Sequence, residues 1–367
     1  MQDKTLAAAV KLVSAAVAVP DLLKRLLETP GPTGSESAPA AVWREAASDF
    51  ADVSGDVVGN SLARVQGTRE GPLLALFGHV DEIGLTVTHA DERGNLSVRG
   101  LGGWNPQVLL GQRVEILTRD GRVPGVVAAK REPRRRGDDE KKRVEVEDLH
   151  IDIGASDADD AWKVVRRGDP AVLAVQPVEL LNGRIASRAL DNRLGAYIVL
   201  EAARRVAEAG GTGDVVAVAT VEEEVGDFLG ARAAAFALEP AVAIAVDVTW
   251  ASDVPGGDPK EYGEQKLGDG AAILRGPGVA PRLFDALLET AEGEGIQHCV
   301  EVSTGRSHTD ADAVYVSRAG IPTGVVSIPL RHMHTPGEIC DLGDVEACIA
   351  LIAAFARRLG PEADFAR

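Results

Sequence analysis

The sequence predicts a mixed α/β protein in which a mostly parallel sheet is flanked by helices and a small β-barrel-like domain is inserted. Three observations carry this prediction. Four short apolar runs alternate with helical stretches over most of the chain, a pattern typical of parallel strands covered on both faces. Between about residues 86 and 180, short β runs broken by Gly and Pro replace that alternation. The chain, at 367 residues, also exceeds the size at which single cores usually stop growing.

The four apolar runs define the expected central strands. They occupy residues 73–77, 215–221, 242–248 and 324–328. Apolar residues at helical spacing, together with Pro and Gly near the ends, predict the flanking helices. These lie at about 1–29 with a break or kink at Pro20, and at about 36–50, 192–209, 281–293 and 344–359.

The stretch 86–180 is expected to form the inserted β domain, and residues 1–85 plus 181–367 the larger domain. The short β runs of the insert lie at residues 96–98, 113–117, 123–128, 149–153 and 172–175. Eight of the fourteen residues from 130 to 143 are Lys or Arg. Because acidic residues are mixed into this run, we interpret it as a solvated loop rather than a polyanion site.

Composition and charge narrow the classes of function. The formal net charge of −17 opposes binding to nucleic-acid backbones and to anionic membranes. No apolar run reaches the roughly 18 residues needed to cross a bilayer. The three Cys residues are too few, and odd in number, for a disulfide framework, which fits a reducing compartment. We therefore expect a cytoplasmic protein with neither nucleic-acid nor membrane partners.

Acidic and histidine side chains gather where the apolar strands end. The four runs end in, or lead to, His79, Glu224, Asp247 and His334, and Asp191 immediately precedes a helix. Taken alone, each of these residues can be explained by a structural role, such as a helix N-cap for Asp191. Ligands of open α/β sheets, however, bind beyond the carboxyl ends of the strands, so the set predicts one metal site at that edge. Without cations, such crowded carboxylates would repel and raise one another's pKa.

Five candidate ligands exceed what one catalytic zinc ion takes, which is about three protein ligands and one open position. Two ions roughly 3.5–4 Å apart, bridged by a carboxylate, account for the number. Asp191 is the expected bridge between the two ions. His79 and Asp247 are expected to complete the coordination of one ion, and Glu224 and His334 that of the other. Imidazole with carboxylate suits zinc, and cobalt or manganese are the alternatives.

Two further acids are expected beside the ligands. Asp81 follows His79 at strand-like spacing on the same face, so its carboxylate can accept a hydrogen bond from the imidazole and fix the tautomer. Glu223 adjoins Glu224 but points elsewhere, and it is assigned proton transfer from the attacking water to the leaving amine. A solvent-facing Glu223 is the alternative.

Several motifs carry these residues in order along the chain. In the larger domain they are GHVDEIG at 78–84, ALDNRLG at 189–195, VEEEVG at 221–226, Asp247 followed by DVPG at 253–256, and IPLRHMHTP at 328–336. In the insert they are GGWNPQ at 102–107 and IDIGAS at 151–156. Together, from about residue 22 to 352, they resemble the tetrahedral (TET) aminopeptidase, or glutamyl aminopeptidase, family of co-catalytic metallopeptidases.

This resemblance implies a two-metal aminopeptidase that releases N-terminal residues from short peptides and has the co-catalytic metallo-aminopeptidase fold. It implies the same ligand set, with His334 rather than His332 as a ligand, and Glu223 as general base. It also implies self-association into dimers and a dodecameric shell, with subunit contacts made by the inserted domain. The chain departs from the family pattern at Glu222, where Gln is usual, and in one extra residue after Gly226.

Other functions stay open from the sequence. A related two-metal deacylase or deblocking enzyme would share the site chemistry and differ in its pocket. A catalytically idle assembly protein would have lost a ligand or the base, and no such loss is seen. A glycosidase using Glu223 and Glu224 is disfavoured, because adjacent residues of a strand face opposite sides. The pocket walls are expected from loops around 252–280 and 303–312, with His308 in the wall rather than as a ligand.

Overall fold

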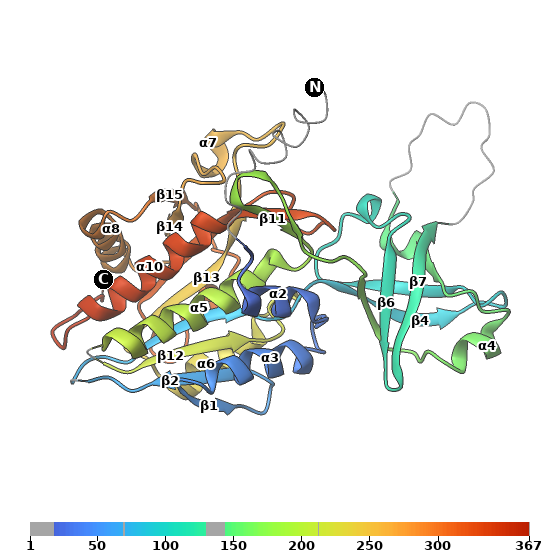
Figure 1. Cartoon of the computed structure of the whole chain (residues 1–367), viewed down its shortest axis with the longest axis horizontal. Coiled ribbons are helices and arrows are strands. Elements are labelled where there is room, and N and C mark those ends of the chain that lie inside the picture. The colour runs from blue at the N-terminus through green and yellow to red at the C-terminus, as the bar shows by residue number, and fades with distance from the viewer. Residues whose placement is uncertain (1–17, 69, 130–143, 212, 367) are drawn as a thin grey trace, which may run out of the picture.

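The computed structural model describes residues 18–68, 70–129, 144–211 and 213–366. The expected helical residues 1–17 and the basic run 130–143 lie outside this part of the chain. The structure confirms the predicted fold class, because a mixed sheet flanked by helices stands beside a closed β-barrel (Figure 1). Among the described residues, no helix combines the length and the apolar character that crossing a membrane requires.

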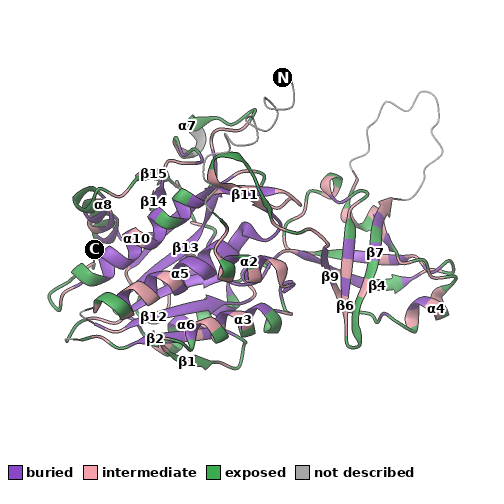
Figure 2. Ribbon diagram, in the orientation of Figure 1, coloured by how far each residue is buried: buried purple, intermediate pink, exposed green. Residues whose placement is uncertain are grey.

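An eight-stranded mixed sheet forms the centre of the larger part. Its strands, in spatial order, are β1 (Asp52–Gly55), β2 (Ser61–Val65), β12 (Val215–Thr220), β3 (Leu74–His79), β13 (Val242–Trp250), β16 (Thr323–Leu330), β14 (Ala271–Arg275) and β15 (His298–Val302). The four predicted strands, β12, β3, β13 and β16, are neighbours in the middle and run parallel. They are buried on both faces, as their continuous hydrophobicity predicts (Figure 2). The other four strands, which the sequence did not predict, extend the two edges.

Helices cover both faces of this sheet. One face carries α5 (Leu190–Ala209), α10 (Leu342–Arg358), α8 (Pro281–Glu294), α2 (Asp21–Glu28) and α3 (Ser37–Ala47), which share one large core with it. The opposite face carries α6 (Leu229–Leu238) and α9 (Ala311–Val314). Two further helices are short, α4 (Ala158–Trp162) and α7 (Pro259–Tyr262). α2 begins directly after Pro20, the predicted break.

Residues 84–173 form a closed barrel with a core of its own. Its strands, in order around the barrel, are β4 (Gly84–Ala90), β5 (Leu96–Leu101), β8 (Leu149–Asp152), β7 (Gly121–Ala129), β6 (Arg113–Thr118) and β9 (Pro170–Leu173). A separate small sheet consists of β10 (Val178–Glu179), β11 (Arg184–Ser187) and β17 (Glu338–Asp341). Short 3₁₀ turns lie at Pro106–Val108, Val146–Asp148 and Leu181–Gly183. The sequence predicted the five later barrel strands but not β4, the strand that follows the GHVDEIG motif.

Helix α5 lies close against β3 because Gly78 of β3 has no side chain to separate the strand from the backbone of the helix. A Cβ atom at Gly78, in β3, would stand 2.5 Å from the carbonyl carbon of Gly195 in α5. Trp43 of α3 holds the same turn of α5, because its indole Nε1–H donates a 2.8 Å hydrogen bond to the carbonyl oxygen of Ala196. The close approach brings the start of α5 to the carboxyl end of β3, where the candidate site begins.

Candidate metal centre

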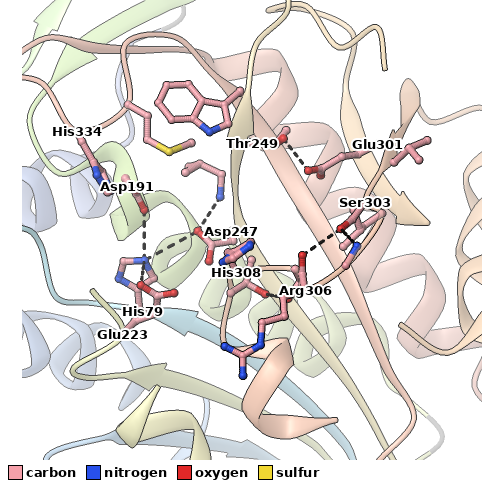
Figure 3. Close-up of a pocket in the computed structure, with 18 of the residues that line it drawn as sticks. His79, Asp191, Glu223, Asp247, Thr249, Glu301, Ser303, Arg306, His308 and His334 are labelled. Carbon is pink, nitrogen blue, oxygen red and sulfur yellow. Dashed lines mark hydrogen bonds and ion pairs between the residues drawn. The ribbon is translucent and has the colours of Figure 1, made fainter. Parts of the chain in front are cut away.

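The five predicted ligands meet at the carboxyl edge of the four parallel strands, around one cavity (Figure 3). His79 is the last residue of β3, and Asp247 lies near the end of β13. Glu224 follows β12, His334 follows β16, and Asp191 comes from the first turn of α5. Segments that lie far apart in the sequence therefore deliver their side chains to one place, because parallel neighbours end at the same edge.

Asp191 stands between the two histidines. Its Oδ1 lies 3.3 Å from Nε2 of His79, and its Oδ2 lies 3.2 Å from Nε2 of His334. Each carboxylate oxygen thus faces a different imidazole, which is the arrangement that a bridging carboxylate needs. The peptide bond between Asp191 and Asn192 is cis.

The remaining acids divide between the two sides of Asp191. On one side, Nε2 of His79 lies 3.6 Å from Glu223 Oε2 and 3.9 Å from Asp247 Oδ1. On the other, Nε2 of His334 lies 3.5 Å from Glu224 Oε2. The described residues form two groups of potential ligands, and within each group the ligand atoms lie within 4.8 Å of one another. One group is His79 with Glu223 and Asp247, and the other is His79 with Asp191 and Glu224. Distance alone therefore does not separate Glu223 from the ligands.

Burial dominates the electrostatics of the cluster. It raises the pKa of Glu223, Glu224 and Asp247 well above their ordinary values, because each carboxylate is removed from water beside other acids. Burial acts in the same direction on Asp191, but hydrogen bonds from the two histidines outweigh it and lower its pKa. The cluster thus holds more acidic groups than its two imidazoles can balance.

The donor set fits divalent cations. Glu224 Oε1 is buried and has no hydrogen-bond partner among the described residues. A carboxylate oxygen left in this state is costly unless a cation meets it. Two imidazoles with several carboxylates form a ligand set that suits zinc and related transition metals. The uncompensated charge and the unpaired oxygen both point to metal binding at this position.

Asp81 lies behind His79, as its spacing predicts. Its Oδ1 is 3.3 Å from Nδ1 of His79, on the side of the ring away from the cluster. Its carboxylate also accepts hydrogen bonds from the Thr33 hydroxyl, at 2.7 Å, and from the backbone N–H groups of Glu223 and Glu224, at 3.3 and 3.2 Å. Asp81 therefore links the end of β3 to the segment that follows β12.

Glu338 is a buried acid at the site that the sequence reasoning missed. It lies on β17, and its carboxylate accepts hydrogen bonds from the backbone N–H of Asp191, at 3.1 Å, and of His334, at 2.9 Å. It thereby holds the backbone of two candidate ligands at once. The available signal was its place just after the IPLRHMHTP motif, four residues beyond His334.

The cavity in front of the cluster has a volume of about 500 Å³. Residues 302–309 form one wall, in agreement with the expected loop 303–312, and His308 is exposed within that wall. Among the residues of the expected loop 252–280 whose side chains the structure describes, only Leu274 lines the cavity. Trp250 and Met333 supply further apolar surface, and Glu301 lies on the side away from His79 (Figure 3). A side chain of amino-acid size can therefore enter beside the acidic cluster.

The chain resembles known proteins over nearly its full length. Residues 59–351 match the family described as M42 glutamyl aminopeptidase. A lysyl aminopeptidase of Pyrococcus furiosus is 34% identical over 347 residues, which cover 93% of this chain and 97% of that protein.

Solved structures with this fold include close relatives. A TET aminopeptidase from Thaumarchaeota archaeon SCGC AB-539-E09 superposes with a TM-score of 0.88 at 34% identity, over 93% of this chain and 96% of that one. The Pyrococcus horikoshii TET1 peptidase, described as assembling into a tetrahedron or a large octahedral shell, has a TM-score of 0.81 at 30% identity. That match covers 92% of this chain and 99% of the other.

Proposed function

The chain belongs to the M42 glutamyl aminopeptidase family of peptide-bond hydrolases, and from this premise we propose a two-metal aminopeptidase that removes N-terminal residues from short peptides. The observation that carries the proposal is the position of Asp191, whose two carboxylate oxygens each face a different histidine. A single ion would leave one of these histidines, and the acid beside it, without a role.

In this proposal Asp191 would hold both of two divalent ions. His79 and Asp247 would hold the first ion with it, and Glu224 and His334 would hold the second, in keeping with the distances on the two sides of Asp191. Zinc is the expected metal, with cobalt and manganese as alternatives. When bound, the ions supply Lewis acidity, which lowers the pKa of water and polarises the scissile carbonyl.

Glu223 is the proposed general base. Its carboxylate accepts a proton from the attacking water and returns it to the nitrogen of the leaving amine. The Glu223 carboxylate lies 3.6 Å from Nε2 of His79 and lines the cavity, so it is placed beside the cluster to carry the proton between the two transfers. Asp81 positions His79, because its carboxylate faces Nδ1 and leaves Nε2 directed at the cluster.

We also propose that the chain self-associates into dimers and a dodecameric shell. Two observations support this: the TET1 relative is described as forming closed shells, and the barrel presents Val126 and Val164 as exposed apolar side chains. In the proposal the inserted domain, residues 86–180, makes the subunit contacts. Sedimentation velocity of the purified protein checks this, and a monomer at micromolar concentration would contradict it.

Aminoacyl chromogenic amides and their N-acylated counterparts test the proposed activity. Protein stripped of metal should be inactive, and protein loaded with zinc or cobalt should hydrolyse the free-amine substrates only. Cleavage of the acylated compounds instead would indicate a deblocking enzyme or deacylase. Loaded protein that turns over neither class would be an idle scaffold.

The variant Glu223→Gln tests the division of labour within the site. Turnover should fall by about 100-fold or more, because the proton acceptor is lost. About two ions per chain should remain bound, measured by elemental analysis. Glu222→Gln is the matched control, since it removes the same charge one residue away and should retain turnover. Loss of metal in Glu223→Gln would mean that Glu223 is a ligand.

A further inference from the structure

Glu301 reaches the cavity from the far edge of the sheet. It lies on β15, and strand register places it on the same face as Asp247. Asp247 pairs with Ser327 of β16, Ser327 pairs with Ala272 of β14, and Leu274, two residues on, pairs with Glu301. Paired residues share a face and alternate residues return to it. Asp247, near the metal cluster, and Glu301 therefore project from one surface.

The Glu301 carboxylate has two hydroxyl neighbours, Thr249 and Ser327, and no cationic partner among the described residues. The Thr249 hydroxyl donates a 2.8 Å hydrogen bond to Oε1. Oε2 is buried and has no hydrogen-bond partner among the described residues. Leu274, which pairs with Glu301 across the two strands, lines the same cavity, as do the apolar side chains of Val302 and Trp250. A buried carboxylate oxygen without a hydrogen-bond partner lowers the free energy of unfolding, and a cation bound beside it would remove this penalty.

The chain itself does not supply that cation. No Lys or Arg forms an ion pair with Glu301 in the part of the chain that the structure describes. Arg306 lines the same cavity but is exposed, and its side chain extends away from the Thr249–Glu301 pair (Figure 3). Burial raises the pKa of Glu301, which is the effect expected of an acid that lacks its charge partner.

We propose that Glu301 binds the cationic side chain of the substrate's N-terminal residue, so that the enzyme prefers peptides that begin with lysine or arginine. This inference rests on the proposed aminopeptidase function. The α-amino end of the substrate lies at the metal cluster, and its side chain runs along Leu274 and Trp250 towards Glu301. The long aliphatic stem packs on the apolar lining, and the terminal ammonium or guanidinium pairs with Oε2.

Lysine and norleucine amides test this assignment directly, because norleucine has an unbranched side chain of similar length that ends in a methyl group. The metal-loaded protein should show a higher kcat/KM for the lysine substrate. Glu301→Gln should lower the lysine-to-norleucine ratio by about 10- to 100-fold, the effect of losing a hydrogen-bonded charge partner. Glu301→Asp keeps the charge and should give an intermediate ratio. Free L-lysine and L-norleucine as competitive inhibitors should follow the same order.

The control is Glu292→Gln, which removes one negative charge from the exposed side of α8, outside the cavity lining. Its ratio should equal that of the unmodified protein, and melting temperatures should show that all variants fold. An unchanged ratio in Glu301→Gln, or a preference of the unmodified protein for glutamate substrates, would overturn the inference while leaving the aminopeptidase proposal standing. Absence of turnover for every free-amine substrate would overturn both.

Discussion

At the scale of single residues, the site depends on carboxylates that serve different purposes although their chemistry is the same. Asp191 faces both histidines, Asp81 lies 3.3 Å from Nδ1 of His79, and Glu338 accepts hydrogen bonds from the backbone of Asp191 and of His334. The sequence predicted the first two acids, because they lie within motifs beside the strand ends. It did not predict Glu338, because nothing local to β17 indicates that two distant N–H groups will converge on that residue.

The variant Glu338→Gln tests this supporting role. The carboxylate accepts one hydrogen bond on each oxygen, whereas the amide has a single acceptor oxygen and would direct an NH₂ group at the other N–H. Metal affinity should therefore fall by about 10- to 100-fold, the usual effect of losing a group that orients a ligand. Competition with a chelator of known affinity measures the change. Affinity equal to that of the unmodified protein would show that Glu338 is not needed to position the ligands.

At the scale of elements, the contact between α5 and β3 sets the geometry of the centre. Gly78 lets the backbone of α5 at Gly195 lie against the strand, so that Asp191 at the start of α5 reaches His79 at the end of β3. The sequence predicted both elements from their hydrophobic pattern. Their close approach could not be predicted, because a glycine in a motif does not reveal which backbone it faces.

We expect Gly78→Ala to disturb both stability and metal binding. The added methyl group would overlap the backbone of α5, so the helix must shift, at a cost of about 1–3 kcal/mol in the free energy of unfolding. The shift moves Asp191 relative to His79, and metal affinity should fall with it. Thermal melting and chelator competition report the two effects. Gly360→Ala is the control, since a Cβ atom there meets no atom within 4 Å; identical behaviour of both variants would contradict the packing argument.

At the scale of the whole molecule, the fold gathers acidic groups that it cannot neutralise by itself. The formal net charge is −17, and burial raises the pKa of Glu223, Glu224 and Asp247 within one cluster. Folding without cations therefore forces these groups to hold protons or to repel one another. Binding of cations to the folded chain, and not to the unfolded chain, should relieve this cost.

Removal of metal should accordingly lower the melting temperature of the protein. Added zinc should restore it in a concentration-dependent manner, and an ion present at 1,000 times its Kd stabilises the folded state by about 4 kcal/mol. Differential scanning calorimetry of stripped and reloaded protein measures this. Magnesium, which prefers an octahedral set of oxygen ligands, is the control and should restore less. Equal melting temperatures with and without zinc would argue against a metal centre in this cluster.

The sequence by itself determined the fold class, the four central strands and the five candidate ligands. These features are local, because buried parallel strands are continuously apolar and most of the candidate ligands lie at or shortly after their carboxyl ends. Only the tertiary structure decided which atoms face each other: the two oxygens of Asp191 towards two histidines, the carboxylate of Glu338 towards two N–H groups, and the carboxylate of Glu301 towards the Thr249 hydroxyl. These relations depend on strand register and helix packing between segments far apart in the chain, and a local pattern of residues does not encode them.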